Sequence, residues 1–238
     1  SKSGIKFPIT ATAAAFGLVP RINASGRFGS PLTAARLLLT DDENEAALFA
    51  DELEELNTQR KKEENSIIQN ISDSVNHNPD LLIERVLVLS GEGWHHGIIG
   101  IVASRILERF DKPCFIITRE GEISRGSARS FGGFSIFGAL QYCEDLLIKY
   151  GGHPGAGGFS IETSKIPEFT ERLQKYAGDI FDFMPLPDIT ADKLILPSEI
   201  TIDNVKGLKI LEPFGEGSRQ PVFAMGGTSV QELSLIHI

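Results

Sequence analysis

The sequence lacks the features that mark membrane proteins and secreted proteins. No apolar run among its 238 residues approaches the roughly 18 residues of a membrane span, and the opening SKSGIKFPIT has no signal-peptide hydrophobic region. Only two cysteines occur, Cys114 and Cys143, and neither belongs to a CxxC motif. A disulfide scaffold and a zinc ribbon are therefore excluded, and we expect a globular cytoplasmic protein with no membrane partner.

The chain also lacks the net positive charge that is typical of nucleic-acid-binding proteins. Its formal charge is −9, and the ten acidic and three basic side chains of residues 41–64 account for −7 of it. We interpret this acidic block as a solvated helix face. The rest of the chain is nearly neutral, which leaves room for a locally basic cleft.

Apolar spacing predicts two helices in the first third of the chain. The first begins at Ser30 and Pro31, which suit the cap and first-turn positions, and runs to Leu39. The second follows a capping box at 40–43 and carries apolar residues at spacings of three or four up to Val75. It would hold about 35 residues and be about 50 Å long. We interpret it as a connector between domains rather than as a coiled coil, because no strict heptad persists.

The middle of the chain alternates strand-like and helix-like segments, which predicts an α/β domain with a mixed sheet. The expected order is strand 85–90, helix 97–110, strands 114–119 and 123–129, helix 135–150, strand 158–161 and helix 166–176. Residues 193–201, 205–211 and 222–225 then predict a short strand, a helix and a strand. The closing LSLIHI has no fold left to pack against, so we expect a truncation or a foreign read-through tail.

The segment GSARS is the first candidate for chemistry. Side chains alternate along a strand, so Arg125, Ser127 and Arg129 share one face of the strand 123–129. Two guanidiniums beside a hydroxyl form a receptor for a phosphate or another oxyanion. The alternative is a half-exposed strand with ordinary surface arginines, and this segment alone favours that alternative.

The glycine-rich segment YGGHPGAGGF, residues 150–159, is the second candidate. We expect a helix to end at Tyr150, with Gly151 in the left-handed conformation at its end. Consecutive glycines let backbone N–H groups approach an anion, and His153 adds a donor or proton-transfer group beside them. The alternative is a helix stop with an incidental histidine.

Two further segments remain open between a functional and a structural interpretation. PRINASGR, residues 20–27, predicts a compact polar loop whose arginines either contact phosphate and sugar or satisfy nearby carboxylates and carbonyls. GWHHGIIGIVASRI contains the adjacent His95 and His96, but no acidic residue stands at HExxH spacing and neighbouring side chains on regular structure diverge. We therefore discount a metal site there and expect a strand-to-helix turn in which Trp94 packs.

Taken in order, these segments resemble the RecJ family of the DHH phosphoesterase superfamily, single-strand-specific exonucleases that degrade DNA from the 5′ end. GLVPRINASGRFG is similar to the close of the RecJ catalytic core, and the long acidic helix to its interdomain connector. GWHHGIIGIVASRI, GSARS and YGGHPGAGGF are similar to the start, middle and signature of the DHH-associated domain, and LEPFGEGSRQPVF to the beginning of an OB-fold.

The resemblance implies an α/β fold in four parts. Residues 1–40 would be the end of the DHH catalytic domain, and residues 41–78 the connector helix. Residues 79–185 would form the DHH-associated substrate-binding domain with its mixed sheet. Residues 190–238 would be an incomplete β-barrel OB-fold that ends in the foreign tail.

The resemblance also implies roles for particular residues. Ser127 and Arg129 match the residues that hold the 5′ phosphate end, with Arg125 on the same strand face. Gly151, Gly152 and His153 match the GGH signature that faces the metal centre, so His153 is the expected catalytic residue. By the same resemblance, Arg21, Asn23 and Arg27 fall in the loop at the edge of the family's substrate channel.

Hydrolysis in this family needs two divalent metals, Mn²⁺ or Mg²⁺, held by aspartates and histidines that include a DHH triplet. No DHH triplet occurs in this sequence. We therefore expect the metal ligands to lie outside the chain, and the chain alone to be an inactive fragment that holds the substrate. The expected partner is single-stranded DNA with a 5′ end, and the resemblance allows a single-strand-binding protein or a helicase as well.

Two other readings compete with the exonuclease. One is a shorter DHH-family enzyme that acts on oligoribonucleotides or nucleotide phosphates, but the long connector and the LEPFGEG extension argue against it. The other is a catalytically silent relative that binds nucleic acid or acts as a scaffold, which nothing in these residues excludes.

Overall fold

The computed structural model describes residues 9–183, 190–215 and 217–227. Contacts divide these residues into two compact units, of which one contains residues 20–183. The other combines residues 9–19 with residues 190–227. Each unit is described by itself, and the candidate site lies within residues 20–183.

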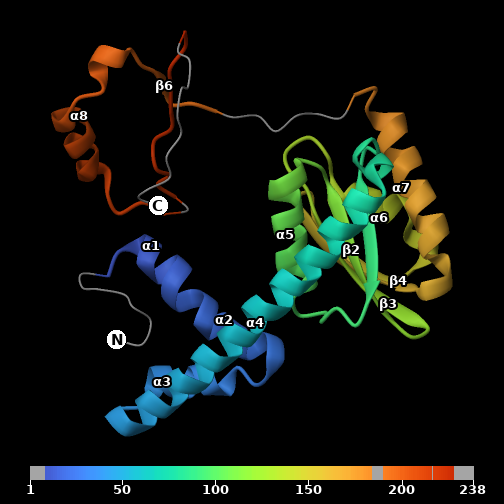
Figure 1. Cartoon of the computed structure of the whole chain (residues 1–238), viewed down its shortest axis with the longest axis horizontal. Helices are drawn as coiled ribbons and strands as arrows, with labels where there is room; N and C mark the ends of the chain where they lie inside the picture. Colours follow the sequence, from blue (N-terminus) through green and yellow to red (C-terminus); the bar gives the residue numbers. More distant parts are fainter. Residues whose placement is uncertain (1–8, 184–189, 216, 228–238) are drawn as a thin grey trace. The chain divides into compact units, whose positions relative to one another are not determined.

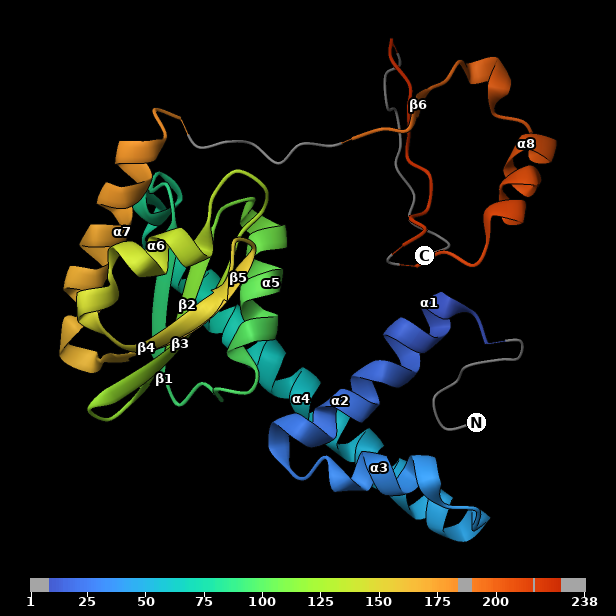
Figure 2. The same cartoon turned by 180° about the vertical axis from the view of Figure 1, so that it is seen from behind.

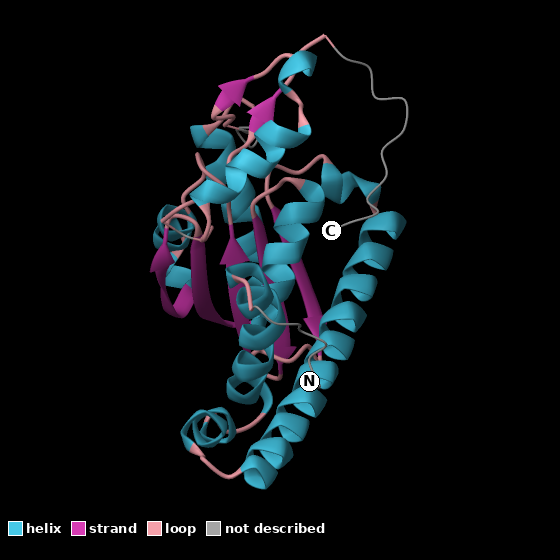
Figure 3. Cartoon of the chain, turned by 90° about the vertical axis from the view of Figure 1, so that its left-hand side faces the viewer, coloured by secondary structure: helices cyan, strands magenta, loops and turns pink. Residues whose placement is uncertain are grey.

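Three helices precede the sheet of the larger unit. They are α2 (Val19–Phe28), α3 (Leu32–Leu39) and α4 (Glu43–His77). The carboxylate of Asp42 caps α4 by accepting hydrogen bonds from the backbone N–H groups of Asn44 and Glu45. With 35 residues, α4 has the length that the sequence predicts, and it is the longest helix in Figure 3.

A five-stranded mixed sheet forms the centre of the unit. Its strands are β1 (Leu87–Glu92), β2 (Cys114–Glu120), β3 (Ile123–Arg129), β4 (Leu147–His153) and β5 (Ala156–Glu162). They lie in the order β1-β2-β3-β5-β4, and only β1 and β2 pair in parallel. The α/β class and the mixed sheet are therefore confirmed.

Helices cover the two faces of this sheet unequally. On one face α6 (Ile136–Tyr142) and α7 (Ile166–Ile180) pack over a core that includes Phe115, Phe159 and Phe169. On the other face α5 (Ile99–Phe110) packs over β2 and β3, and the C-terminal half of α4 shares a core with β1. Figures 1 and 2 show α5 and α7 on opposite sides of the strands.

Small residues bring α5 close to the strands beneath it. A Cβ added at Gly100 would lie 3.2 Å from the Ser127 hydroxyl oxygen and 3.3 Å from a nitrogen of Arg129. The backbone carbonyl of Ala103 accepts a 3.1 Å hydrogen bond from the Cys114 thiol. The small residues Gly100 and Ala103 therefore permit a close approach of the helix to the sheet.

Two predictions about local structure are wrong. The expected helix 135–150 ends at Tyr142, and the segment 147–153 is strand β4. Gly151 therefore does not end a helix in the left-handed conformation. The glycine with a positive φ is Gly152 within the strand, where φ is +150°. The expected polar loop 20–27 is the helix α2, in which Ala24 and Ser25 are buried.

The C-terminal residues form a small unit with little regular structure. Strands β6 (Lys193–Leu194) and β7 (Phe223–Ala224) pair in parallel, and α8 (Ile202–Gly207) lies between them in sequence. Within residues 190–227, the described part of the predicted OB-fold contains no barrel. The closing LSLIHI lies outside the described residues.

Candidate nucleic-acid interface

The half of the sheet formed by β3, β5 and β4 brings two of the sequence candidates together. The side chains of Arg125, Ser127 and Arg129 alternate along β3 with the buried Ser124, Gly126 and Ala128, so the predicted common face is confirmed. On this face α5 packs over β2 and over the Ser127–Arg129 end of β3. Beyond β3 the face continues over β5 and β4, where Gly158, Gly151 and His153 are exposed. We call this surface of β3, β5 and β4 the open face.

The strand register aligns the GSARS and GGH segments row by row. Ser127 pairs with Gly158, which pairs with Gly151. Arg129 pairs with Ala156, which pairs with His153. Neighbouring strands are about 4.8 Å apart, so each row spans about 10 Å from β3 to β4. The two segments are therefore parts of one surface.

The register also adds two residues that the sequence analysis missed. Arg125 pairs with Ser160, and Ser160 pairs with Lys149, which forms a third row on the open face. Lys149 is exposed and borders a shallow pocket of about 380 Å³ together with Gly151, Gly158 and Ser160. The sequence assigned Lys149 to a helix, so its place beside Arg125 could not be recognised.

Glycines leave the backbone of the open face exposed. Gly151 and Gly158 place no side chain on it, so the backbone of β4 and β5 is accessible there. Gly152 is required for a different reason, because a Cβ at this position would lie 2.2 Å from the Ala156 carbonyl oxygen. The two glycines of the GGH segment therefore have different roles, one on the surface and one in the strand pairing.

The imidazole of His153 is exposed at the end of β4. Its Nδ1 atom accepts a 3.2 Å hydrogen bond from the backbone N–H of Gly155. In the neutral ring the proton therefore resides on Nε2. This arrangement leaves the Nε2–H group as a donor.

The guanidinium of Arg129 is half-buried at the edge of α5. It donates hydrogen bonds to the Ala128 carbonyl oxygen over 2.8 Å and to the Ser127 hydroxyl oxygen over 3.2 Å. Burial lowers the pKa of Arg129 below its usual value, with the neighbouring Cys114 acting in the opposite direction. Arginine remains charged at neutral pH even so, and the charge is held next to a hydroxyl.

Arg27 of α2 adds a second half-buried guanidinium near Arg129. It donates a 2.6 Å hydrogen bond to the Gly97 carbonyl oxygen at the start of the α5 segment. Burial lowers its pKa most, the positive charges of Arg60 and Arg129 lower it further, and Glu64 raises it. Like charges near one another destabilise each other, and an anion bound nearby relieves that repulsion.

The other two predicted residues of α2 differ from Arg27. Arg21 forms an ion pair with Glu54 of α4, which agrees with the structural interpretation of this arginine. Arg21 and Arg27 are six positions apart, which places them on different sides of a helix. Asn23 is exposed and lies four residues before Arg27, hence on the same side of α2.

The adjacent histidines lie in the turn between β1 and α5, and Trp94 before them is buried, as predicted. Their rings do not diverge, because this segment is a turn rather than regular structure. The centroids are 5.0 Å apart and the ring planes differ by 13°.

The described residues contain neither a metal cluster nor a membrane-spanning helix. Within residues 9–183, 190–215 and 217–227, no three His, Cys, Asp or Glu side chains are grouped so that they could hold a metal ion. None of the helices in the described part of the chain has both the length and the apolar character needed to cross a membrane.

Comparisons with known proteins identify the class. Residues 79–179 match the DHHA1 domain family, which covers the whole sheet and the helices α5, α6 and α7. The chain is 36% identical over 213 residues to the single-stranded-DNA-specific exonuclease RecJ of Thermus thermophilus, and 33% identical over 211 residues to that of Bacillus subtilis. These matches cover 90% and 87% of this chain.

Solved structures agree with the sequence matches. The crystal structure of Thermus thermophilus RecJ in complex with Mn²⁺ superposes with a TM-score of 0.81 and 34% identity, over 94% of this chain and 33% of that chain. In sequence and in structure the chain is therefore similar to part of RecJ. It spans 30% of the Thermus relative and 26% of the Bacillus relative.

Proposed function

We propose that the open face holds the 5′ phosphate end of single-stranded DNA for a 5′ to 3′ exonuclease of DNA repair and recombination. The observation that carries this proposal is the alignment of Arg125, Ser127 and Arg129 with the glycine rows of β5 and β4. Backbone phosphates fit a surface that combines guanidiniums, a hydroxyl and an exposed glycine backbone. The names of the RecJ relatives, which are single-stranded-DNA-specific exonucleases, support the choice of substrate.

The proposed roles follow from position. Arg129 and Ser127 bind the terminal phosphate, with Arg27 as the second positive charge and Asn23 beside it on α2. Arg125 and Lys149 bind phosphates further along the strand, over Gly151 and Gly158. Of the proposed phosphate-binding residues, Arg21 has the weakest support, because Glu54 already pairs with it.

His153 is the proposed catalytic residue. The residue lies on the open face, in the row of Arg129. There its Nε2–H group can donate to a phosphate oxygen on which negative charge develops. A donor of this kind acts on the transition state, so loss of His153 in an active protein lowers kcat more than it raises KM.

Divalent metals belong to the proposal only as part of a larger assembly. The RecJ structures from Thermus thermophilus are complexes with Mg²⁺ or Mn²⁺. Two metal ions clamp the attacking and leaving oxygens in phosphodiester hydrolysis. The described residues of this chain do not fit such a centre, so we place its ligands elsewhere and assign no hydrolytic step to these residues.

The division into parts stays a proposal as well. It assigns residues 1–40 to the end of a catalytic domain, 41–78 to a connector, 79–185 to the substrate-binding domain and 190–238 to the beginning of an OB-fold. A single-strand-binding protein or a helicase is a further proposed partner, for which the described surface offers no specific support.

Binding measurements on the chain test the proposed function. We expect fluorescence anisotropy to show tighter binding of a single strand than of the corresponding duplex, with an affinity that falls as the salt concentration rises. Equal affinity for both, or no salt dependence, contradicts it. With a hydrolytically active protein, faster digestion of oligonucleotides of two to five residues than of long single-stranded DNA would favour an oligoribonuclease-type enzyme instead.

A further inference from the structure

A second pocket lies next to the open face, between α2, α4 and the turn from β1 to α5. Its volume is about 620 Å³, and its lining includes Phe28, Trp94, His95, His96 and Glu120. We call it the histidine pocket. None of these five residues takes part in the phosphate contacts proposed above.

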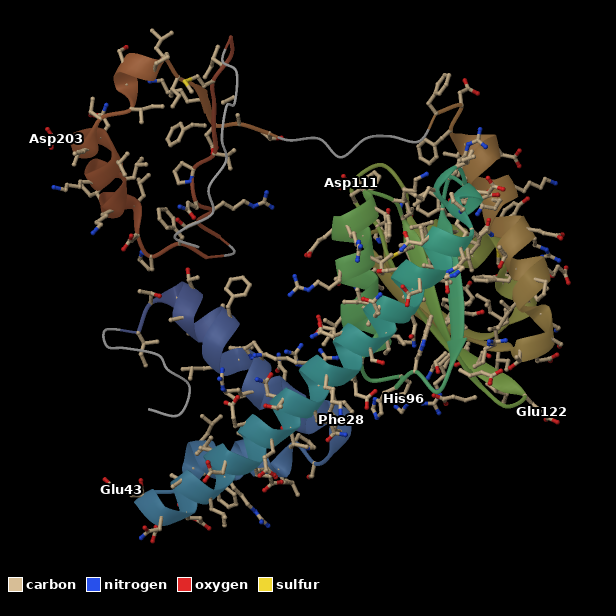
Figure 4. The ribbon with its side chains drawn as sticks, viewed as in Figure 1. Phe28, Glu43, His96, Asp111, Glu122 and Asp203 are labelled. Atoms are coloured by element: carbon tan, nitrogen blue, oxygen red, sulfur yellow. The ribbon has the colours of Figure 1, made fainter. Side chains whose placement is uncertain are left out.

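Three rings of the pocket form an ordered aromatic platform. The Phe28 and His95 ring centroids are 4.7 Å apart with planes tilted by 46°, and His95 stacks on His96 at 5.0 Å. Figure 4 shows the Phe28 and His96 side chains at neighbouring positions near the β1–α5 turn. The His95 ring is fixed, because its Nδ1 atom accepts a 3.1 Å hydrogen bond from the Gly97 backbone N–H.

The outer ring of this platform is open to solvent. The His96 side chain is 52% exposed, so its second face is accessible while His95 covers the first. Core packing does not require an exposed ring at this position. Within the described residues, these histidines and the neighbouring carboxylates form no group of three that could hold a metal ion.

An ion-pair chain connects the platform with the open face. Nδ1 of His96 lies 3.7 Å from Oε1 of Glu120, and Nε of Arg125 lies 3.8 Å from Oε2 of the same carboxylate. Arg125 is the first of the three phosphate-binding residues on β3. A strand whose phosphates lie along β3 therefore passes within reach of the pocket.

The charges of the pocket favour a base over a phosphate as its occupant. Glu63 and Glu120 both line it, whereas Arg119 is its one lining cation among the described residues. Two carboxylates repel a phosphate, but they accept hydrogen bonds from the ring and amino N–H groups of a base. Stacking on an aromatic side chain suits any base, because every base has a π-face.

We propose that the histidine pocket binds one unpaired nucleobase of the strand whose phosphates lie along Arg125, Ser127 and Arg129. The base stacks on the exposed face of the His96 ring. This inference rests on the proposed function, since it needs a single strand on the open face.

A scan with single abasic sites tests this inference. A set of 5′-phosphorylated oligonucleotides of one sequence, each lacking one base, is titrated against the chain by fluorescence anisotropy. We expect loss of the base at one position, or at two adjacent positions, to weaken binding about fivefold or more, in keeping with the loss of one stacked base. Equal affinity for all members of the set overturns the proposal.

Three variants identify the ring as the cause. His96→Phe keeps a stacking ring without the ion pair to Glu120, so it preserves the position-dependent effect. His96→Gln keeps a polar group but removes the ring, so we expect it to abolish the position-dependent effect. His77→Ala is the matched control, because His77 is an exposed histidine of α4 outside the pocket, and it leaves the effect unchanged. Loss of the effect in His96→Phe, or its survival in His96→Gln, overturns the stacking role.

Trp94 supplies an independent local readout. It is the only tryptophan of the chain and lines the pocket. We expect its fluorescence to change on addition of the intact strand and not on addition of an abasic strand of equal length. If both strands change it equally while binding still depends on the 5′ phosphate, the pocket proposal fails and the proposed function stands. If no strand binds, both fail.

Discussion

The guanidinium of Arg27 donates a hydrogen bond of 2.6 Å to the backbone carbonyl oxygen of Gly97. This bond joins α2 to the turn before α5, across 70 positions of sequence. The same turn carries the fixed ring of His95, and the same guanidinium adds positive charge near Arg129. Arg27 therefore has a structural role and a proposed binding role at once.

Arg27→Ala separates these two roles. We expect the variant to lower the free energy of unfolding by about 1.5 to 3 kcal/mol, the cost of losing a hydrogen bond from a charged group. Urea denaturation measures this change. Arg36→Ala is the control, because Arg36 is an exposed arginine on α3, and it should change stability by no more than about 0.5 kcal/mol. A stability loss no larger than that of the control would remove the structural role.

Gly152→Ala and Gly151→Ala divide the GGH segment into a folding part and a binding part. An alanine at position 152 meets the Ala156 carbonyl at 2.2 Å and adopts an unfavourable φ of +150°, so we expect a loss of about 2 to 5 kcal/mol in stability. Position 151 has open space around a Cβ, so Gly151→Ala leaves stability nearly unchanged. It weakens DNA binding instead, because the added methyl group projects from the open face. Thermal denaturation and anisotropy together distinguish the two outcomes, and equal stability of both variants would contradict the distinction.

Glu64 is a buried carboxylate at the contact between α4 and α5. Only 6% of the residue is exposed, and it accepts hydrogen bonds from Arg60 over 2.7 Å and from Arg105 over 3.4 Å. Removing one member of a buried ion pair leaves uncompensated charge, so Glu64→Ala should cost about 3 to 5 kcal/mol of stability. Glu55→Ala, at an exposed position of the same helix, serves as the control. A small loss of stability in Glu64→Ala would show that water solvates the carboxylate at this helix contact.

Both cysteines are predicted to be unreactive in the folded protein. Burial raises the pKa of Cys114 to about 12 and that of Cys143 to about 12. The thiolate is the reactive form, so a thiol reagent at pH 8 should modify neither cysteine until the chain unfolds. Rapid modification of the folded protein would contradict the burial of these side chains.

The same two pKa values predict how stability depends on alkaline pH. The unfolded thiols lose their protons near pH 8.5, whereas the folded thiols keep theirs up to about pH 12. The contribution of these thiols to stability is therefore complete below pH 8.5 and declines as the pH rises toward 12. Cys114→Ala should show a shallower decline than the unaltered chain in denaturation experiments across this range.

The sequence predicts most of the sheet but misassigns one edge strand for a specific reason. Leu147 and Tyr150 continue the three- and four-residue spacing of the preceding helix, which indicates a longer helix. In the structure, β4 has a bulge between Leu147 and Lys149, so that Leu147 and Tyr150 pair with Ile161 and Phe159 on the same buried face. A bulge adds one residue and thereby imitates helical spacing within a strand. Strand β3 has no bulge, and its bounds are those that alternation predicts.

The misassigned edge strand also hid part of the site. With residues 147–150 in a helix, GSARS and GGH remain separate candidates, and Lys149 has no place near Arg125. Tertiary contacts caused the other error, because the composition of residues 20–27 favours a loop while the ion pair of Arg21 with Glu54 and the burial of Ala24 stabilise a helix. The local sequence pattern of residues 20–27 shows neither the ion pair with Glu54 nor the burial of Ala24.

The most direct test compares two strands of one sequence, one with a 5′ phosphate and one with a 5′ hydroxyl, against the chain and its Arg129→Ala variant. We expect the unaltered chain to prefer the phosphorylated strand. We also expect Arg129→Ala to weaken binding of that strand by about 1 to 3 kcal/mol, with a smaller effect on the hydroxyl strand and none in the Arg36→Ala control. Equal weakening for both strands would make Arg129 a general backbone contact. No preference in the unaltered chain would contradict end recognition by the open face.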